Sequence, residues 1–248
     1  MGGARYLAEI QATIARVGAE QAEAVGRAAD VIVSALLADG VVQAFGSGHS
    51  EALAMEVAGR AGGLVPTNRL ALRDLVMYGG ESPEALRDGK LERDPGVARR
   101  LYELAEVRPA DVFVIASNSG INGSIVELAS VVKEHDHPLI AVTSAEQSRL
   151  LPPRHPSGHR LLDLADVVLD NGAPYGDAAM RLPSGAGVCA VSSITGALLA
   201  QMVTAEVVRR LVDAGHTPPV YLSANVPGGD EHNHALESRY AGRIRRTA

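Results

Sequence analysis

Short apolar runs alternate with longer amphipathic segments along most of the chain. The spacing of apolar residues in the longer segments predicts helices between the runs. Such alternation is typical of right-handed crossovers that join parallel strands, with helices on both faces of one sheet. We therefore predict an α/β fold. The predicted strands lie at 41–45, 64–67, 111–116, 138–143 and 166–170, and the helices between them at 50–61, 97–106 and 123–135.

Two further segments predict longer helices. From residue 6 to residue 38 the apolar positions lie along one side of a single helix, which Asp39 and Gly40 end. A helix of about 30 residues spans roughly 45 Å. That length exceeds the width of a small sheet, so we expect part of this helix to contact a second subunit. The segment 188–213 is apolar almost all round, which suits a helix buried between the sheet and a partner.

We treat residues 1–248 as a single domain, because this length is ordinary for one α/β domain and nothing in the composition demands two. We expect a long N-terminal helix within 1–40 and the α/β core at 41–213. The remaining residues, 214–248, are expected to form an extension that completes the site or the dimer.

Composition narrows the class of partner. The formal net charge is -6, and the only basic run is the short one at 243–246, which argues against a nucleic-acid surface. Aromatic residues make up 3% of the chain and Trp is absent, so platforms that stack on bases are not expected either. We therefore expect a small-molecule partner and no nucleic acid.

Cysteine content and the distribution of apolar residues bear on location. Cys189 is the only cysteine, so we expect neither a disulfide framework nor a zinc cluster of thiolates. The first residues lack the apolar core of a signal peptide, and no apolar run is long enough to cross a bilayer. We expect a cytoplasmic protein without membrane contact.

Two turns rich in Gly and Ser each follow a predicted strand and lead into a predicted helix. The first, FGSGHS, covers 45–50, and the second, SNSGINGS, covers 117–124. Because parallel strands end at one edge of a sheet, both turns should converge over one crevice. Hydroxyl groups and backbone N–H groups there would hold a phosphate monoester. The alternative is a pair of ordinary βα turns, in which Gly permits the turn and Ser or Asn caps the helix.

The motifs of nucleotide-binding proteins are absent from both turns. The first turn has no Lys, as a Walker motif would, and Glu51 stands where the dinucleotide fingerprint needs Gly. The only lysines of the chain are Lys90 and Lys133, which argues against a triphosphate site and against a Schiff base. We expect no cofactor.

The two turns resemble those of sugar isomerase (SIS) domains, which bind phosphosugars at two Ser/Thr-rich turns. That resemblance covers roughly residues 25–213. A narrower one, to a bacterial group of stand-alone SIS proteins, extends over essentially the full chain. It is carried by FGSGHS, RAGGLVP, SNSG, TSAEQS, GDAA and LSANVPGGDEHN. The resemblance implies a three-layer α/β/α sandwich with a five-stranded parallel sheet, and a homodimer with active sites near the subunit interface.

The resemblance also assigns roles to single residues. Met55 to Arg60 resembles the segment of phosphoheptose isomerase that carries a catalytic Glu, which implies that Glu56 is the base; an exposed helical carboxylate is the alternative. Ser124 could hold phosphate or simply cap the following helix. The positions at which SIS proteins hold the phosphate match Ser47, Ser117, Ser119, Asn122 and, as a further candidate, Ser124.

Two histidines are further candidates for proton transfer. His49, in the first turn, would favour a bound dianion as a cation, or would move protons near pH 7 as a neutral group. The alternative is a loop histidine in water. We expect His232 to act as an acid or base that reaches a site, which could be the partner's. His232 and His234 lie close to Asp230 and Glu231, but histidines at i and i+2 do not share a helix face, so we expect no metal site.

Two glutamates lie in the irregular stretch 73–96, where a lid over the sugar would be placed. Glu81 is a candidate for the catalytic machinery, with surface charge as the alternative. For Glu92 we expect surface charge.

A carboxylate near C2 of an open-chain aldose phosphate can remove the proton beside the C1 carbonyl. Return of that proton at C1 makes an isomerase, whereas loss of the C3 substituent makes a lyase. Two isomerase patterns are incomplete here: the chain has no Lys after Lys133 and no His within 188–213. We expect a lyase or dehydratase acting on an amino-sugar 6-phosphate such as N-acetylglucosamine 6-phosphate. The alternatives are an aldose–ketose isomerase and a non-catalytic phosphosugar sensor.

Overall fold

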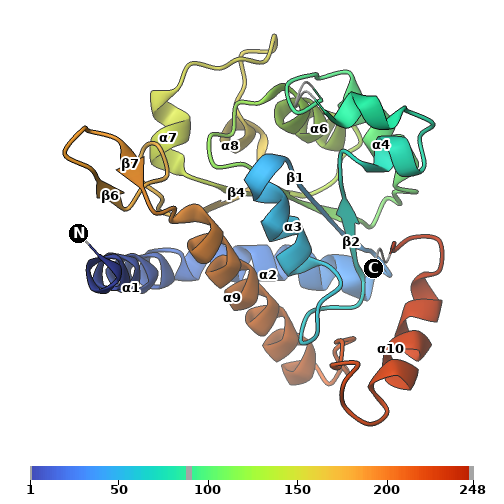
Figure 1. Ribbon diagram of the computed structural model, residues 1–248. Coiled ribbons are helices and arrows are strands. Elements are labelled where there is room, and N and C mark those ends of the chain that lie inside the picture. The colour runs from blue at the N-terminus through green and yellow to red at the C-terminus, as the bar shows by residue number, and fades with distance from the viewer. Residues whose placement is uncertain (1, 88–90, 246–248) are drawn as a thin grey trace.

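The computed structural model describes residues 2–87 and 91–245, so Lys90 and Arg246 lie outside the described residues. A five-stranded sheet, parallel throughout, forms its centre with the order β2-β1-β3-β4-β5 (Figure 1). Helices cover both faces, which confirms the predicted three-layer α/β/α sandwich. The strands are β1 (Val42–Gly46), β2 (Thr67–Leu70), β3 (Val112–Ala116), β4 (Leu139–Thr143) and β5 (Val167–Asp170).

Alternation along the strands divides the apolar core between the two faces. In β3, Val112 and Val114 pack beneath the helices of one face, whereas Phe113 and Ile115 pack beneath those of the other. The first face carries α2 (Ala22–Leu37), α3 (Glu51–Val57) and α9 (Ser192–Asp213). The second carries α4 (Asp74–Met77), α5 (Val97–Leu104), α6 (Gly123–Glu134) and α8 (Leu161–Leu164).

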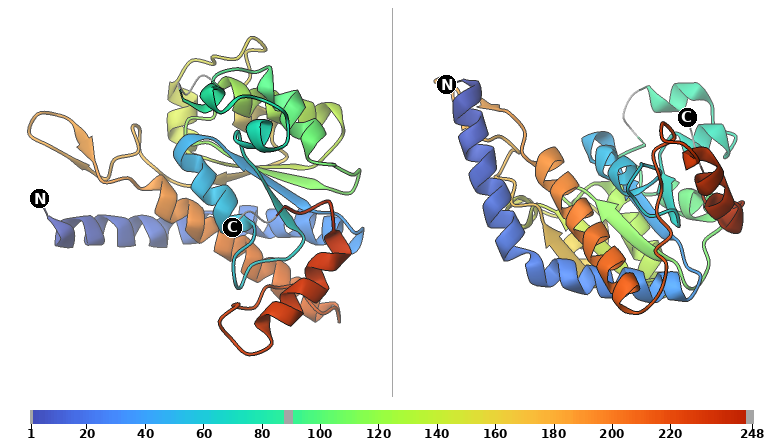
Figure 2. Two further views of the ribbon diagram at one scale, coloured as in Figure 1. Left: turned by 45° about the vertical axis from the view of Figure 1, so that its right-hand side comes forward. Right: turned by 90° about the horizontal axis from the view of Figure 1, so that it is seen from below.

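A helix opens the chain as predicted, but the expected single helix over 6–38 is divided. α1 (Gly3–Glu20) ends before Gln21, which has φ −96° and ψ 1°, and α2 begins at Ala22. Figure 2 shows the two helices running at an angle to each other. The Gln21 side chain accepts a 3.0 Å hydrogen bond from the Asp170 backbone, which ties the bend to β5. The apolar spacing continues through the bend, so the sequence pattern did not reveal it.

The predicted strand at 64–67 is displaced toward the C-terminus, because β2 begins only at Thr67. Pro66 has no N–H to donate. The apolar residues before it pair instead with the C-terminal extension: Val65 N donates to Pro219 O at 2.8 Å, and Tyr221 N donates to Gly63 O at 2.9 Å. The run is extended as expected, but its partner is a segment more than 150 residues away.

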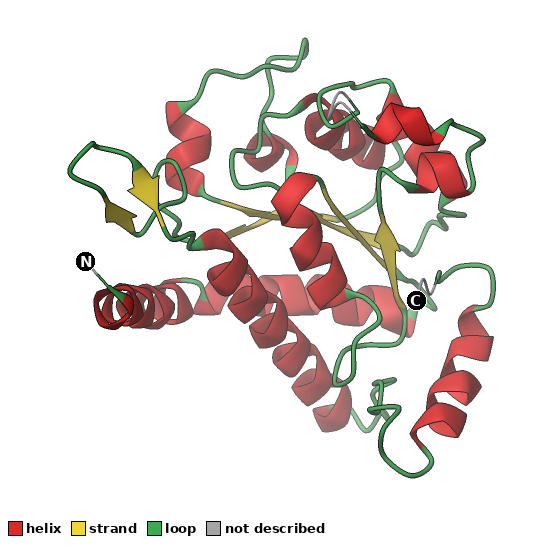
Figure 3. Cartoon of the chain, in the orientation of Figure 1, coloured by secondary structure: helices red, strands yellow, loops and turns green. Residues whose placement is uncertain are grey.

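Two predicted helices are shorter than expected. α3 ends at Val57 rather than at 61, ahead of Gly59 with its positive φ of 81°. The segment 188–213 becomes helical only at Ser192, because its first residue pairs in a small hairpin of β6 (Met180–Arg181) and β7 (Gly187–Val188). Figure 3 shows this hairpin beside the start of α9. The other helical pieces are η1 (Gly48–Ser50), η2 (Pro83–Leu86), α7 (Ala145–Leu150), α10 (Gly229–Glu237) and η3 (Ser238–Tyr240).

The C-terminal extension closes the end of the sheet at which the strands begin. A buried ion pair joins Arg243 Nη2 to Asp111 Oδ1 at 2.7 Å, just before β3. Asp111 also accepts hydrogen bonds from Val41 N and Gln43 Nε2, both at 2.9 Å. Its carboxylate therefore links β1, the start of β3 and the C-terminal extension. Within the described ranges, no helix is both long and apolar enough to cross a membrane.

Candidate functional site

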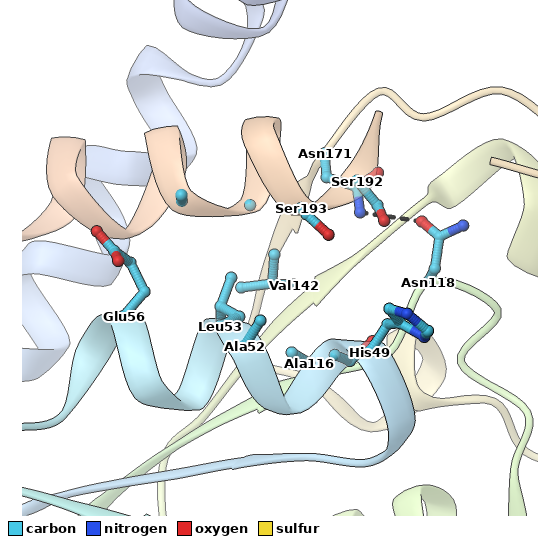
Figure 4. A pocket seen from close by; sticks show the side chains of 13 residues that line it. His49, Ala52, Leu53, Glu56, Ala116, Asn118, Val142, Asn171, Ser192 and Ser193 are labelled. Carbon is cyan, nitrogen blue, oxygen red and sulfur yellow. Dashed lines mark hydrogen bonds between the residues drawn. The ribbon is translucent and has the colours of Figure 1, made fainter. Parts of the chain in front are cut away.

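A cavity of about 190 Å³ lies between α3 and α9, at the ends of β3 and β4 (Figure 4). Ala116 and Val142, the last or next-to-last residues of those strands, line it together with Leu53 of α3. Polar groups reach it from several turns at this edge of the sheet, as expected for a parallel sheet. The polar residues that line the cavity are His49, Ser50, Glu56, Asn118, Asn171, Ser192 and Ser193.

The first Gly/Ser turn follows β1 tightly. A side chain at Gly46 would overlap the carbonyl oxygen of Ser50, so this turn requires glycine there. Ser47 is buried and extended, and no hydrogen bond of its hydroxyl is found among the described residues. His49 is exposed on η1 and lines the cavity, where Figure 4 shows it opposite Asn118. The turn therefore offers the hydroxyls of Ser47 and Ser50 and the imidazole of His49.

The second turn places Asn118 in the cavity and holds it from both sides. Its Oδ1 accepts a 3.0 Å bond from Asn171 Nδ2, the dashed line in Figure 4, and its Nδ2 donates to Gln147 Oε1 at 3.0 Å. Ser117 is buried, and its hydroxyl accepts the Gly120 N–H at 3.1 Å, which shapes the turn. The side chain of Asn118 is thus fixed before any ligand arrives.

The later residues of this turn meet Glu92. Asn122 Nδ2 donates to Glu92 Oε1 at 2.5 Å. The hydroxyl of Ser124 is fully buried and donates to Glu92 O at 2.7 Å, so in this structure it anchors the chain rather than facing the cavity. Ser119 is partly exposed, and none of the described residues bonds its hydroxyl. The expectation that Glu92 is only surface charge is wrong, because its carboxylate contacts the turn.

Glu56 extends from the last turn of α3 into the cavity, toward α9. Its Oε1 accepts a 2.7 Å hydrogen bond from Gln201 Nε2 and a bond from the Arg60 guanidinium. The Glu56 side chain is 20% exposed, so it is largely enclosed without being sealed from a ligand. Glu56 therefore lines the cavity rather than an open helix surface, and only its Oε1 is bonded by the described residues.

The N-terminal end of α9 supplies the opposite wall. Asp177 Oδ1 accepts the backbone N–H groups of Val191 and Ser192 at 3.0 and 2.8 Å, and its Oδ2 accepts the Ser192 hydroxyl at 2.6 Å. The carboxylate thus caps the helix from outside. In Figure 4 the hydroxyl of Ser193 points into the space between α9 and α3.

Glu81 and His232 are not among the residues that line this cavity. Glu81 pairs with the guanidinium of Arg100 on α5, which belongs to the opposite face of the sheet. His232 lies on α10, where its Nε2 is 3.0 Å from the carbonyl oxygen of Val220. Within one chain, the structure therefore leaves both candidates away from Glu56. The part of the chain that the structure describes contains no group of three or more residues suited to a metal ion.

Sequence reasoning missed several residues of the cavity. Asn118 belongs to the SNSG turn, which the sequence analysis singled out, but Asn118 itself and its bonded neighbours in space were not predicted as site residues. Asn171 directly follows the fifth predicted strand, so the rule that parallel strands end at one edge could have identified it. Ser193 and Gln147, which bonds Asn118 without lining the cavity itself, have no comparable signal, because their positions depend on how α9 and α7 pack.

Comparisons with known proteins agree with this architecture. Residues 5–144 match the family model of the SIS domain. A UPF0309 protein of Listeria monocytogenes is 42% identical over 225 residues, which cover 90% of this chain and 91% of the relative. A UPF0309 protein of Geobacillus kaustophilus is 34% identical over 241 residues, covering 97% and 94%. The chain therefore belongs to the SIS domain family and, within it, to the UPF0309 proteins.

Solved structures show the same fold at low identity. Phosphoheptose isomerase GmhA from Neisseria gonorrhoeae aligns with a TM-score of 0.54 at 19% identity, over 82% of this chain and 95% of that one. A phosphoheptose isomerase from Francisella tularensis aligns with a TM-score of 0.54 at 16% identity, over 84% and 98%. The narrow resemblance to stand-alone SIS proteins, expected from the motifs, is confirmed.

Proposed function

We propose that the chain is a phosphosugar enzyme that removes a proton from C2 of its substrate with Glu56. The observation that carries this proposal is the place of Glu56 in the cavity. Gln201 and Arg60 both donate to Oε1, which fixes the carboxylate plane and leaves Oε2 for the proton. A carboxylate held in this way on the wall of a small polar cavity is suited to general-base catalysis.

The proposed phosphate ligands lie on the two Gly/Ser turns and do not themselves line the cavity, whereas His49, Ser50 and Asn118 of the same turns do. His49 and Glu56 are seven residues apart, which corresponds to about 10 Å along a helical rise. A ligand with its phosphate near Ser47 and Ser119 would extend from the turns toward Glu56. This arrangement suits an open-chain sugar that carries its anion at one end and its reacting carbon at the other.

For the second half of the reaction we propose elimination. Glu56 takes the C2 proton, the electrons of that bond form an enolate with C1, and the bond from C3 to its substituent then breaks. His49 gives a proton to the leaving oxygen, so that water leaves when the substituent is a hydroxyl. We assign to Asn118 and Ser193, which both line the cavity, the donation of hydrogen bonds to the enolate oxygen.

Elimination is preferred over isomerisation because α9 offers Gln201 and serines opposite Glu56 but no histidine. The chain also has no lysine after Lys133. An amino-sugar 6-phosphate such as N-acetylglucosamine 6-phosphate is the proposed substrate class. The proposed assembly is a homodimer in which the second subunit borders the site.

A proton NMR time course with N-acetylglucosamine 6-phosphate in D2O tests this proposal. A new vinyl resonance together with loss of the C2 proton signal would support the lyase. Exchange of the C2 proton together with ketose signals, and without a vinyl resonance, would contradict the lyase and support the isomerase. An unchanged spectrum with this sugar and with a panel of hexose and heptose phosphates would contradict both enzymes and favour the non-catalytic sensor.

A further inference from the structure

Glu92 brings a negative charge to the point where the two Gly/Ser turns meet. Its Oε1 accepts the 2.5 Å bond from Asn122 in the second turn. A Cβ atom added at Gly48, in the first turn, would lie 3.4 Å from Glu92 Oε2. Since Gly48 has a positive φ of 56° and no side chain, the carboxylate can approach the first turn closely. One carboxylate therefore bonds the second turn and lies beside the first.

The backbone around Glu92 fixes this position. The carbonyl oxygen of Glu92 accepts the backbone N–H of Ser124 at 3.2 Å and its hydroxyl at 2.7 Å. These two bonds attach residue 92 to the first turn of α6, beside Asn122. The carboxylate is thus held against the second turn from an anchored backbone rather than from a freely moving loop.

The surroundings of the carboxylate are those proposed for the substrate phosphate. Asn122 is one of the proposed phosphate ligands, and the hydroxyls of Ser47 and Ser119, on the two turns, have no partner among the described residues. A carboxylate and a phosphate dianion in the same small space would repel each other strongly. Both anions cannot be held there together.

We infer that the Glu92 carboxylate occupies the phosphate position between the two turns in the unliganded protein, and that a phosphosugar must displace it to bind. The inference rests on the proposed function of the turns. Its consequence is a cost common to both ligands: inorganic phosphate and a phosphosugar must each displace Glu92, so each binds less tightly than it would without that carboxylate. A phosphosugar also gains contacts in the cavity that offset this cost, whereas inorganic phosphate gains none.

Isothermal titration of the full chain with N-acetylglucosamine 6-phosphate and with inorganic phosphate tests the inference. Glu92→Gln keeps the length of the side chain and its acceptor for Asn122 but removes the charge. We expect both ligands to bind this variant about tenfold more tightly, since a displaced hydrogen bond to a charged group is worth about 1.5 kcal/mol or more. Glu84→Gln is the matched control, because Glu84 is an exposed glutamate of the same stretch on η2, and its affinity should not change.

The side-chain amide of Asn122 gives a second readout that needs no change at Glu92. Its proton and nitrogen resonances in the unaltered protein should shift when N-acetylglucosamine 6-phosphate is added, because its carboxylate acceptor is replaced by phosphate. Resonances that stay in place while the sugar binds would overturn the inference.

The outcomes separate this inference from the proposed function. Equal affinity of the unaltered protein and Glu92→Gln would overturn the inference and leave the phosphosugar site standing. Weaker binding by Glu92→Gln would also overturn it, because Glu92 would then be a ligand contact. Absence of binding in the unaltered protein and in both variants, for every phosphosugar of the panel, would overturn the inference and the proposed site together.

Discussion

At the scale of single residues, Glu56 should separate catalysis from binding. Glu56→Gln keeps the size of the side chain and a carbonyl acceptor for Gln201, but it removes the group that takes the C2 proton. We expect turnover to fall by about a thousandfold or more, as loss of a general base commonly costs two to four orders of magnitude. Affinity for the phosphosugar should stay within about threefold, measured by titration calorimetry beside the NMR assay.

Glu51→Gln is the control for this variant. Glu51 begins the same helix but pairs with Arg73 at 2.7 Å and does not line the cavity. The Glu51→Gln variant should therefore have the turnover of the unaltered protein. Unchanged turnover in Glu56→Gln would show that Glu56 is not the base. If the variant lost affinity for the phosphosugar as well as turnover, Glu56 would instead be a residue that binds the ligand.

His137 is a buried histidine outside the cavity, and it links stability to pH. Its Nδ1 lies 3.1 Å from the Asp111 carbonyl, which can only accept, so Nδ1 carries the proton and Nε2 accepts from the Tyr102 hydroxyl at 2.8 Å. Burial lowers the pKa of His137 below its ordinary value of 6.5. The unfolded chain therefore binds a proton, as pH falls below 6.5, that the folded chain does not.

Stability from His137 is thus present above pH 6.5 and is lost as the pH falls below it. We expect urea denaturation to show a free energy of unfolding that decreases from pH 7 to pH 5. In His137→Gln this decrease should be smaller, although the variant is less stable at pH 7. His216→Gln, at an exposed histidine, should keep the slope of the unaltered protein. An equal slope in all three proteins would refute the assignment.

The residues of the candidate site differ in how much sequence could say about them. The placement of Ser47, Ser117 and Asn122 on turns after buried strands was predictable from the Gly/Ser pattern, whereas their role as phosphate ligands stays a prediction. The placement of Glu92 was not predictable, since it lies in an irregular stretch and reaches the turns through two bonds of its backbone carbonyl to Ser124. No local pattern of residues encodes such a contact.

At the scale of elements, the start of α9 depends on Asp177, which lies 15 residues before Ser192 in the sequence. Its carboxylate accepts two backbone N–H groups and one hydroxyl there, and its own φ is +52°. We expect Asp177→Ala to lower the free energy of unfolding by about 1–3 kcal/mol, from loss of the cap and from strain at positive φ. Asp177→Gly relieves the strain and loses only the cap, so it should cost less.

Thermal and urea unfolding of the two variants measure this difference. If Asp177→Ala and Asp177→Gly are both as stable as the unaltered protein, the carboxylate does not cap α9 in solution. If the glycine variant is the less stable of the two, strain at this residue is not part of the effect.

The pattern of apolar residues predicted those elements best in which burial against a core determines which positions are apolar. The five strands alternate between two apolar cores or are buried outright, so all five runs were recognised, and only the run before Pro66 was misplaced. The bend at Gln21 was missed because it changes the direction of a helix without changing its apolar side. At the bend the Gln21 side chain bonds Asp170, 149 residues away, and apolar spacing does not report such a contact.

At the scale of the whole molecule, the buried ion pair of Arg243 and Asp111 should be the costliest contact to break. Both side chains are at most 3% exposed, so removal of the guanidinium leaves a buried carboxylate without its counter-charge. We expect Arg243→Met to lower the free energy of unfolding by about 3–5 kcal/mol in urea denaturation. Arg239→Met, at an exposed arginine of η3, should change it by less than about 0.5 kcal/mol.

A second substitution tests whether the charge is the cause. Asp111→Asn in the Arg243→Met background removes the charge that was left alone, so the double variant should lose less than the sum of the two single losses. Strict additivity would indicate that packing at the two sites, rather than their pairing, accounts for the losses.

This ion pair also orders events during synthesis. Asp111 belongs to the middle of the sheet and leaves the ribosome more than a hundred residues before Arg243 does. Until residue 243 has emerged, β1 and β3 can meet only by enclosing a carboxylate without its counter-charge or by leaving that end of the sheet open to water. The nascent chain is therefore expected to keep this end of the sheet unfinished while the residues between Asp111 and Arg243 are synthesised.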